Sequence, residues 1–196
     1  MRYHRSDVVE RAVDVLDMYG LPDMSMRRIA SELGLQPSAL YHHFANKQAL
    51  LAAVADELLE RGTRPLPVDA EWDHQAVALS RELRDAMLAY RDGAELIATV
   101  HAFGLGADTL DGRLSAAISS GGFDDSFARS AATTILYFVF GHVSDEQTHL
   151  QANSAGAIDG DQPARADSAS FELGLTLILD GIRQRRPAVS RAVSAR

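Results

Sequence analysis

Hydrophobic positions recur at helical spacing along most of the chain, whereas the alternation typical of half-buried strands is scarce. The segment 7–19 shows this pattern clearly, because its apolar residues fall at i and i+4 spacings along one face. Asp7 and Glu10 fit a capping box at its start, and Gly20 fits a C-terminal stop. The pattern predicts a helix with one buried stripe, formed by Val8, Val9, Ala12, Val13, Leu16 and Tyr19.

Three further helical patterns follow before the first proline-rich break. One begins after Ser25 and ends at Gly34, and a short one begins at Gln36–Pro37, an N-cap residue and a proline suited to the first turn. Asn46 is a good N-cap for the last of the three, which extends to about Arg61. The residues expected to pack these helices together are Met26, Ile29, Ala30, Leu33, Leu40 and Phe44.

The segment from Thr63 to Val68 (TRPLPV) contains two prolines and interrupts the helical pattern. Residues 153–167 are polar and rich in Gly, Ala and Asp, which predicts a mobile loop. A disordered tail is expected from Pro187. The helices expected after the break cover about 73–91, 94–103, 108–120, 125–150 and 168–185. The predicted fold class is therefore all-α, with a break near residue 64.

Composition excludes several classes of protein. The chain has 196 residues, of which 46% are apolar, enough for a packed core in one domain or in a small domain joined to a larger one. It has no cysteine, which excludes disulfides, thiolate zinc sites and a cysteine nucleophile. No apolar run approaches the roughly 20 residues that span a bilayer, and the charged start lacks a signal-peptide core. We expect a soluble, cytoplasmic protein with no membrane partner.

Charge is unevenly distributed along the chain. The net charge is −8, yet residues 1–47 hold as many basic as acidic side chains, so the whole excess of acid lies in the remainder. DNA binding requires a local cationic face rather than a basic chain. Global charge therefore does not exclude a nucleic-acid partner.

The segment 25–44 has the spacing of a helix-turn-helix, with two short helices joined at Gly34 and Leu35. Packing through the buried residues above would hold the second helix as a rigid rod, which fits the major groove of DNA. That helix exposes a polar face with one aromatic residue, formed by Gln36, Ser38, Ala39, Tyr41, His42 and His43. On spacing and composition alone, an ordinary helical hairpin in a bundle is the alternative.

The run from Met26 to Leu51 resembles the TetR family of bacterial transcriptional regulators. Its signature is a helix-turn-helix that ends in Leu40-Tyr41-x-His43-Phe44, followed by Asn46-Lys47 at the start of the next helix. The resemblance implies an N-terminal three-helix DNA-binding domain over 1–47, a connecting helix over 48–64, and a larger helical domain over 65–186 that binds a ligand and dimerises. The tail, 187–196, lies outside these units.

Three later segments resemble the tetracycline-repressor branch of that family: 91–94 (RDGA), 141–149 (GHVSDEQTH) and 171–182 (FELGLTLILDGI). This likeness implies a homodimer in which two C-terminal helices of each subunit form a four-helix bundle. The residue pattern also favours a dimer, because segments 135–143 and 171–182 are apolar on more than one helical face and so need more cover than one chain offers. Two central helices of a monomeric bundle are the alternative.

The resemblance also assigns DNA contacts to matching positions. Base edges would be met by Arg27 and by the second helix, where Arg or Gln can make bidentate contacts and small apolar groups can pack on thymine methyls. Tyr41, His43 and Lys47 suit phosphates better, since Lys47 lies beside a helix N-terminus. Arg2, His4 and Arg5 would form an arm on the backbone or a disordered end. The full set of expected contacts is Arg27, Gln36, Pro37, Ser38, Ala39, Tyr41, His42, His43 and Lys47.

A small-molecule effector is expected in the larger domain, in an apolar cavity with a few polar groups. The candidate lining residues are Thr63, Leu83, Met87, Tyr90, Val100, His101, Phe103, Leu110, Leu114, Ile118, Tyr137 and Phe138. For any single apolar residue of this set, plain core packing is the more common role. Most family members repress transcription and are released by their ligand, so repression is the default expectation.

In the tetracycline-repressor branch a Mg²⁺–tetracycline complex binds through a histidine and acidic partners. His101, Asp145 and His149 are the candidate metal-site residues here. The chain departs from the branch, however, since the histidine aligns with Ile97, and the ring-binding positions fall on Thr63, Leu79 and Leu83. We therefore expect no required cofactor, with Mg²⁺ entering only as part of a metal-chelated inducer.

An enzyme is the alternative function. Glu71–His74 and Glu146–His149 are two E-x-x-H patterns, which di-metal carboxylate bundles use together with further glutamates. No matching acidic partners stand out, and no other catalytic motif is present. The function expected is a ligand-responsive transcriptional regulator, not an enzyme, that binds a pseudo-palindromic operator as a homodimer.

Overall fold

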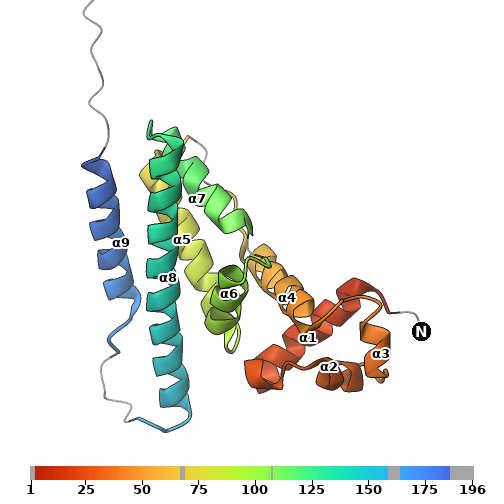
Figure 1. Cartoon of the computed structure of the whole chain (residues 1–196). Helices are drawn as coiled ribbons and strands as arrows, with labels where there is room; N and C mark the ends of the chain where they lie inside the picture. The colour runs from red at the N-terminus through yellow and green to blue at the C-terminus, as the bar shows by residue number, and fades with distance from the viewer. Residues whose placement is uncertain (1–2, 67–68, 107, 159–163, 186–196) are drawn as a thin grey trace, which may run out of the picture.

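The computed structural model describes residues 3–66, 69–106, 108–158 and 164–185. Within these ranges the chain forms nine α-helices and one short 3-10 helix, with no strand, which confirms the all-α class. The helices form a small N-terminal unit and a larger unit, with α4 leading from one to the other (Figure 1). We call these units the head (residues 5–44) and the body (residues 72–183).

The head consists of α1 (Arg5–Tyr19), η1 (Leu21–Asp23), α2 (Met26–Glu32) and α3 (Pro37–Leu40). All six apolar residues expected to pack these helices together are buried, as predicted. The start of α1 differs from the prediction, because the helix begins at Arg5 and Asp7 does not cap with Glu10. Instead, the Asp7 carboxylate accepts a hydrogen bond from the backbone N–H of His4 at 2.6 Å.

Tyr19 is a second difference in the head. The stripe of α1 predicts it buried, but its side chain is exposed at the end of the helix. The Arg28 guanidinium carbon lies 4.0 Å from the centre of the Tyr19 ring. A cation over an aromatic face stabilises an exposed ring, so Tyr19 covers α2 from outside instead of entering the core.

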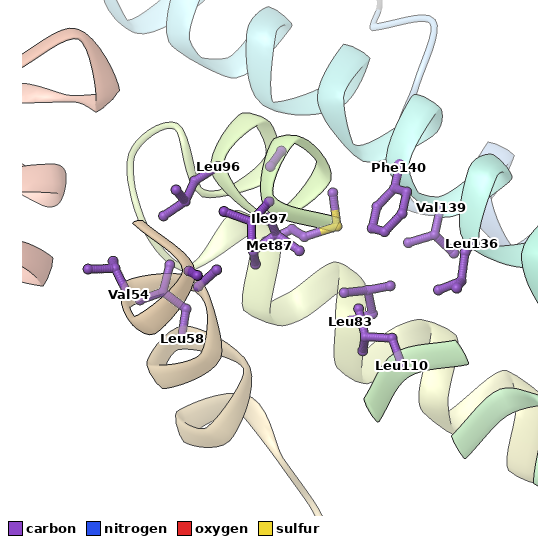
Figure 2. Close-up of a cluster of buried hydrophobic side chains, with 14 of the residues drawn as sticks. Val54, Leu58, Leu83, Met87, Leu96, Ile97, Leu110, Leu136, Val139 and Phe140 are labelled. Atoms are coloured by element: carbon purple, nitrogen blue, oxygen red, sulfur yellow. The ribbon is translucent and has the colours of Figure 1, made fainter. Parts of the chain in front are cut away.

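The helix α4 (Lys47–Gly62) joins the head to the body. It packs against α1 at one side and against α5 (Trp72–Leu88) and α6 (Gly93–Ala102) at the other. Figure 2 shows Val54 and Leu58 of α4 beside Met87 of α5 and Leu96 and Ile97 of α6, in a cluster of buried side chains that continues into the body. The head and the body therefore share one continuous core through α4, since Val54 and Leu58 are fully buried.

The body is completed by α7 (Asp108–Ser120), α8 (Asp125–Ser154) and α9 (Ser168–Arg183). Figure 1 shows α8 and α9 antiparallel, side by side at the edge farthest from the head. Tyr137 of α8 and Leu173 and Leu177 of α9 are 67%, 62% and 64% exposed. The exposed leucines bear out the prediction for α9, whereas the aliphatic residues and phenylalanines of 135–143 in α8 are buried or half-buried within the chain, and of the large side chains in that segment only Tyr137 is exposed.

The segment between α8 and α9 is shorter than predicted. Helix α8 continues to Ser154, and Gly156 with φ +68° ends it, so four residues more than expected are helical. Residues 159–163 of the expected loop and the expected tail 187–196 lie outside the described residues. Of the helices that the structure describes, none has both the length and the hydrophobicity needed to cross a bilayer.

Candidate nucleic-acid interface and ligand cavity

The turn between α2 and α3 is built by local hydrogen bonds and one glycine. The Ser25 hydroxyl accepts a bond from the backbone N–H of Arg28 at 3.1 Å and so caps α2. Gly34 has φ +68°, a conformation that favours glycine, and the backbone N–H of Leu35 bonds to the Ala30 carbonyl at 2.8 Å. Leu40 is fully buried, so α3 is braced against α2. The second helix is held as a rigid element.

The structure places every predicted DNA contact at least partly at the surface, on α2, on the short α3 and the residues flanking it (Gln36 before it, Tyr41 to His43 after it), and at the start of α4. Tyr41 is 54% exposed, although it lies next to the buried Leu40. Lys47 is the first residue of α4, whose N-cap Asn46 accepts a bond from the Ala49 N–H at 2.8 Å. The exposed members are Arg27, Gln36, Ser38, Tyr41 and His42, and the half-buried ones are Pro37, Ala39, His43 and Lys47. Their contacts with bases or phosphates stay predictions.

Arg5 is part of a helix in the structure and not of the expected N-terminal arm. This residue begins α1, and its guanidinium carbon lies 4.7 Å from the centre of the Phe44 ring, just after α3. Arg2 is outside the described residues. Arg5 therefore lies on the same side of the head as α3, which the sequence did not indicate, because the contact joins residues 39 positions apart.

A cavity of about 430 Å³ lies between α4, α5, α7 and the turn after α6. Thr63, Leu83 and Leu110 line it, as predicted. Its charged residues were not predicted: Asp56 and Glu60 come from α4, Glu82 from α5 and Arg113 from α7. The remaining lining residues are Leu59, Ala86, Leu105, Gly106 and Thr109.

The other predicted lining residues do not line this cavity. Met87, Val100, Leu114 and Ile118 are packed into the core with at most 2% exposure. Phe103 and Tyr137 are exposed instead, and the Phe138 ring stacks on Phe171. Tyr90 faces Arg61, whose guanidinium donates to its hydroxyl at 3.3 Å. Tyr90 also lines two other hollows of the surface, and the role of these residues in ligand binding stays a prediction.

His101 is held by a partner that the sequence did not indicate. Its Nε2 lies 2.7 Å from a carboxylate oxygen of Asp111, and its ring lies against Phe140. The structure does not bring Asp145 and His149 to it, and within the described residues no three His, Asp or Glu side chains form a group suited to a metal. The predicted metal site of His101, Asp145 and His149 is therefore not assembled.

A buried polar cluster joins α5, α8 and α9. Arg84 and Glu146 form a bidentate pair, with 16% and 10% of their side chains exposed. His142 Nε2 lies 3.0 Å from the Ser170 hydroxyl, while its Nδ1 is buried without a hydrogen-bond partner. Burial lowers the pKa of His142, against the opposing effect of the Glu146 carboxylate. His142 of α8 therefore lies against α9 in a poorly solvated environment that opposes its protonation.

Family models match both parts of the chain. The model described as bacterial regulatory proteins, tetR family, matches residues 8–54, and the tetracyclin repressor-like C-terminal domain matches residues 64–169. The chain belongs to the TetR family. It is a helix-turn-helix transcriptional regulator and not an enzyme, so the di-metal alternative is wrong; Glu146 of the second E-x-x-H pattern pairs with Arg84.

Relatives of this TetR-family protein match nearly its whole length. The tetracycline repressor protein class A from transposon 1721 of Escherichia coli is 36% identical over 93% of this chain and 91% of its own. BioQ of Mycobacterium smegmatis is 38% identical with a TM-score of 0.84, covering 93% of this chain and 99% of that one.

Two complexes of relatives also resemble this chain. BioQ with its natural double-stranded DNA operator is 36% identical and has a TM-score of 0.78, over 93% of this chain and 99% of that one. A TetR variant of Acinetobacter baumannii AYE in complex with minocycline is 28% identical and has a TM-score of 0.76, over 95% of this chain and 100% of that one.

The metal-chelate site of the tetracycline-repressor branch does not fit this TetR-family chain. Ile97, which the sequence resemblance predicts at the position of the branch's histidine, is fully buried in apolar core. His101, one turn later, already pairs with Asp111.

Proposed function

We propose that this protein is a cytoplasmic homodimer that binds a pseudo-palindromic operator and represses transcription there. A small-molecule effector is proposed to release the dimer from the operator. The observation that carries the proposal is the braced α3, whose polar side chains are exposed while Leu40 and Phe44 anchor it. The operator complex of BioQ supports operator binding, and the minocycline complex of the A. baumannii protein supports a small-molecule effector.

DNA reading follows from the chemistry of the exposed face. In the major groove, Gln36 can make a bidentate contact with N6 and N7 of an adenine, and Arg27 with O6 and N7 of a guanine. Pro37 and Ala39 can pack against thymine methyl groups. Lys47 and the backbone N–H groups at the start of α4 suit a phosphate and fix the register of the head on the duplex.

The dimer is supported by the apolar face of α8 and α9. Leu173 and Leu177 are spaced four residues apart on α9, so they lie on one face, and both are exposed. A second copy related by a two-fold axis would cover this face with the same face of its own. Two heads would then be presented about 34–36 Å apart, which matches one turn of DNA.

The effector is proposed to act through α4. This helix lines the cavity with Asp56 and Glu60, and it packs against α1 of the head. A ligand that favours one position of α4 therefore favours one orientation of the head. A hundredfold change in operator affinity requires about 2.7 kcal/mol of coupling, which is within the usual range. Mg²⁺ has no part unless a chelating effector carries it.

Selection of bound DNA tests the proposal. Purified protein would be mixed with fragmented genomic DNA from its host, and the retained fragments would be sequenced and then titrated by fluorescence anisotropy. We expect an inverted repeat whose half-site centres lie about 10 base pairs apart. Retained fragments without a shared motif, or a single unrepeated half-site, would contradict the proposal.

A further inference from the structure

The head carries a cation, Arg5, that no carboxylate within the described residues neutralises. Arg11 of the same helix pairs with Asp14 at 3.1 Å, and Arg28 of α2 pairs with Glu32 at 3.2 Å. Arg5 is exposed, so its charge is open to a partner that arrives from solvent. Resting on the proposed binding of operator DNA, we infer that Arg5 holds a phosphate of the operator backbone.

The ring of Phe44 fixes the position of Arg5. The guanidinium carbon lies 4.7 Å from the centre of the ring, and Phe44 is itself held by the core, with 2% exposure. A guanidinium attracted to the face of an aromatic ring keeps its N–H donors at the edge of its own plane, where an anion can reach them. Two of these donors match two oxygens of a phosphate. Phe44 therefore orders Arg5 without occupying the donors that an anion needs.

Arg5 lies beside the helix that is proposed to enter the major groove. Phe44 follows the end of α3 by four residues, and Figure 1 shows the N-terminal end of α1 next to α3 at one edge of the head. Lys47, the other proposed phosphate contact, comes three residues after Phe44. The phosphate backbones border the groove, so a cation beside α3 faces a backbone when α3 lies in the groove.

The contact is a fixed one and not that of a free arm. Arg5 is the first residue of α1, and the backbone N–H of His4 before it donates to the Asp7 carboxylate at 2.6 Å. A side chain that is ordered before binding loses less entropy when it meets its partner. Because every sequence presents phosphates, Arg5 adds affinity and helps to fix the orientation of the head, and it adds no preference for a base.

The salt dependence of operator binding measures this contact. Full-length wild type and Arg5→Ala would be titrated by fluorescence anisotropy against the inverted repeat recovered by selection, between about 50 and about 200 mM salt. Loss of one phosphate contact should lower the magnitude of the slope of log K against log salt by about 0.9. The advantage of the wild type in affinity should therefore shrink by about 3.5-fold over this range. Equal slopes for the two proteins would overturn the inference.

Two further variants separate the charge of Arg5 from its packing. Arg5→Lys keeps the positive charge but lacks the planar group that stacks on Phe44, so it should keep the slope and lose part of the affinity. Arg11→Ala is the matched control, because Arg11 is on the same helix but pairs with Asp14. It should keep the slope of the wild type. A slope in Arg5→Lys or Arg11→Ala as low as that in Arg5→Ala would contradict the assignment, since a change in the packing of α1 would then explain the loss.

Neutral phosphates identify the partner of Arg5. A methylphosphonate, which lacks the charge of a phosphate, would be placed at the same position of both half-sites and moved along the half-site one position at a time. At one position the wild type and Arg5→Ala should bind with affinities within about twofold, whereas elsewhere the wild type should bind at least about fivefold more tightly. An advantage of the wild type that is the same at every position would show that Arg5 does not contact a phosphate.

A duplex without an inverted repeat separates this inference from the proposed function. Since all duplexes share the phosphates, Arg5→Ala should lower the slope on this duplex as well. If the wild type prefers the inverted repeat and Arg5→Ala has the same slope, the inference on Arg5 fails and the regulator proposal stands. If the wild type shows no such preference while Arg5→Ala lowers the slope, the regulator proposal fails and the phosphate contact of Arg5 stands.

Discussion

The carboxylate of Asp92 accepts a hydrogen bond from the backbone N–H of Leu21 at 2.7 Å, which links the body to the head. Its other oxygen accepts a bond from the Gln151 side-chain amide of α8 at 2.9 Å. Asp92 has φ +55°, a left-handed conformation that is uncommon for a residue with a side chain and that aspartate tolerates better than most. One residue before α6 thus ties η1 of the head to the long helix of the body.

Replacing Asp92 should weaken the contact between the two units. In Asp92→Ala the part-buried N–H of Leu21 loses its partner, and we expect a loss of about 1–3 kcal/mol in the free energy of unfolding. Asp92→Asn keeps one acceptor oxygen and the tolerance for positive φ, so its loss should be smaller. Urea unfolding followed by circular dichroism measures both, and equal stability of Asp92→Ala and the wild type would refute the link.

Lys47→Ala should weaken operator binding to a similar extent for every DNA sequence. The lysine lies at the N-terminus of α4, a position suited to a phosphate, which all sequences share. We expect the slope of log K against log salt to fall in magnitude by about 1. Arg129→Ala, an exposed arginine on α8 in the body, is the control and should leave the slope unchanged. A slope in Lys47→Ala equal to that of the wild type would exclude the phosphate contact.

Charges on the outer face of α9 should separate the dimer. Leu173 and Leu177 are exposed in the single chain, so Leu173→Glu with Leu177→Glu should leave its helical content intact. Burying one leucine is worth about 1.5–3 kcal/mol, and a two-fold interface would lose two from each subunit. Light scattering should then give one chain of 21.2 kDa instead of two, with operator affinity lowered at least a hundredfold.

A matched control for the dimer test is Leu150→Glu. This leucine is also about half exposed, but it lies near the C-terminal end of α8. It should keep the mass and the operator affinity of the wild type. A monomeric wild type, or a double α9 variant that stays dimeric, would show that this face is not the interface.

Stability should depend on pH through His142. Because burial lowers the pKa of this imidazole below 6.5, the unfolded chain binds a proton there at a higher pH than the folded chain. The contribution of neutral His142 to the free energy of unfolding is fully present above pH 6.5 and is lost as the pH falls below that value. The free energy of unfolding should fall there by at most about 1.4 kcal/mol per pH unit. His142→Gln should flatten the decline between pH 6.5 and 5, whereas His74→Gln, at an exposed site, should not. If the free energy of unfolding fell equally with pH in the wild type and in His142→Gln, His142 would not be the cause of the pH dependence.

Helical periodicity and turn residues predict the nine α-helices that the structure describes, but not the 3-10 helix η1, and α3 is indicated by its cap and proline rather than by a buried stripe. Helix ends are less predictable. The helix α8 passes the expected end because no glycine lies between residue 150 and Gly156, and α1 starts early because Asp7 bonds to the N–H of His4. The exact first and last residues of a helix depend on single hydrogen bonds that compete within one turn.

Apolar residues predicted the lining of the cavity only in part. Met87 and Ile118, like Leu83, are apolar residues on the buried stripe of a helix, yet of the three only Leu83 borders the cavity. Glu82 was the available signal, because a charged residue next to Leu83 on the buried side of α5 requires a partner. The partner, Arg113, is 31 positions away, and only the packing of α5 on α7 brings the two together.

The spacing of the two half-sites tests the central claim most directly, namely that two braced α3 helices of one dimer read one face of a duplex. An inverted repeat recovered by selection would be compared with the same repeat carrying about five extra base pairs at its centre, half a helical turn. Anisotropy titrations at fixed salt should show at least a hundredfold weaker binding to the lengthened duplex. Equal affinity for the two duplexes would contradict the account.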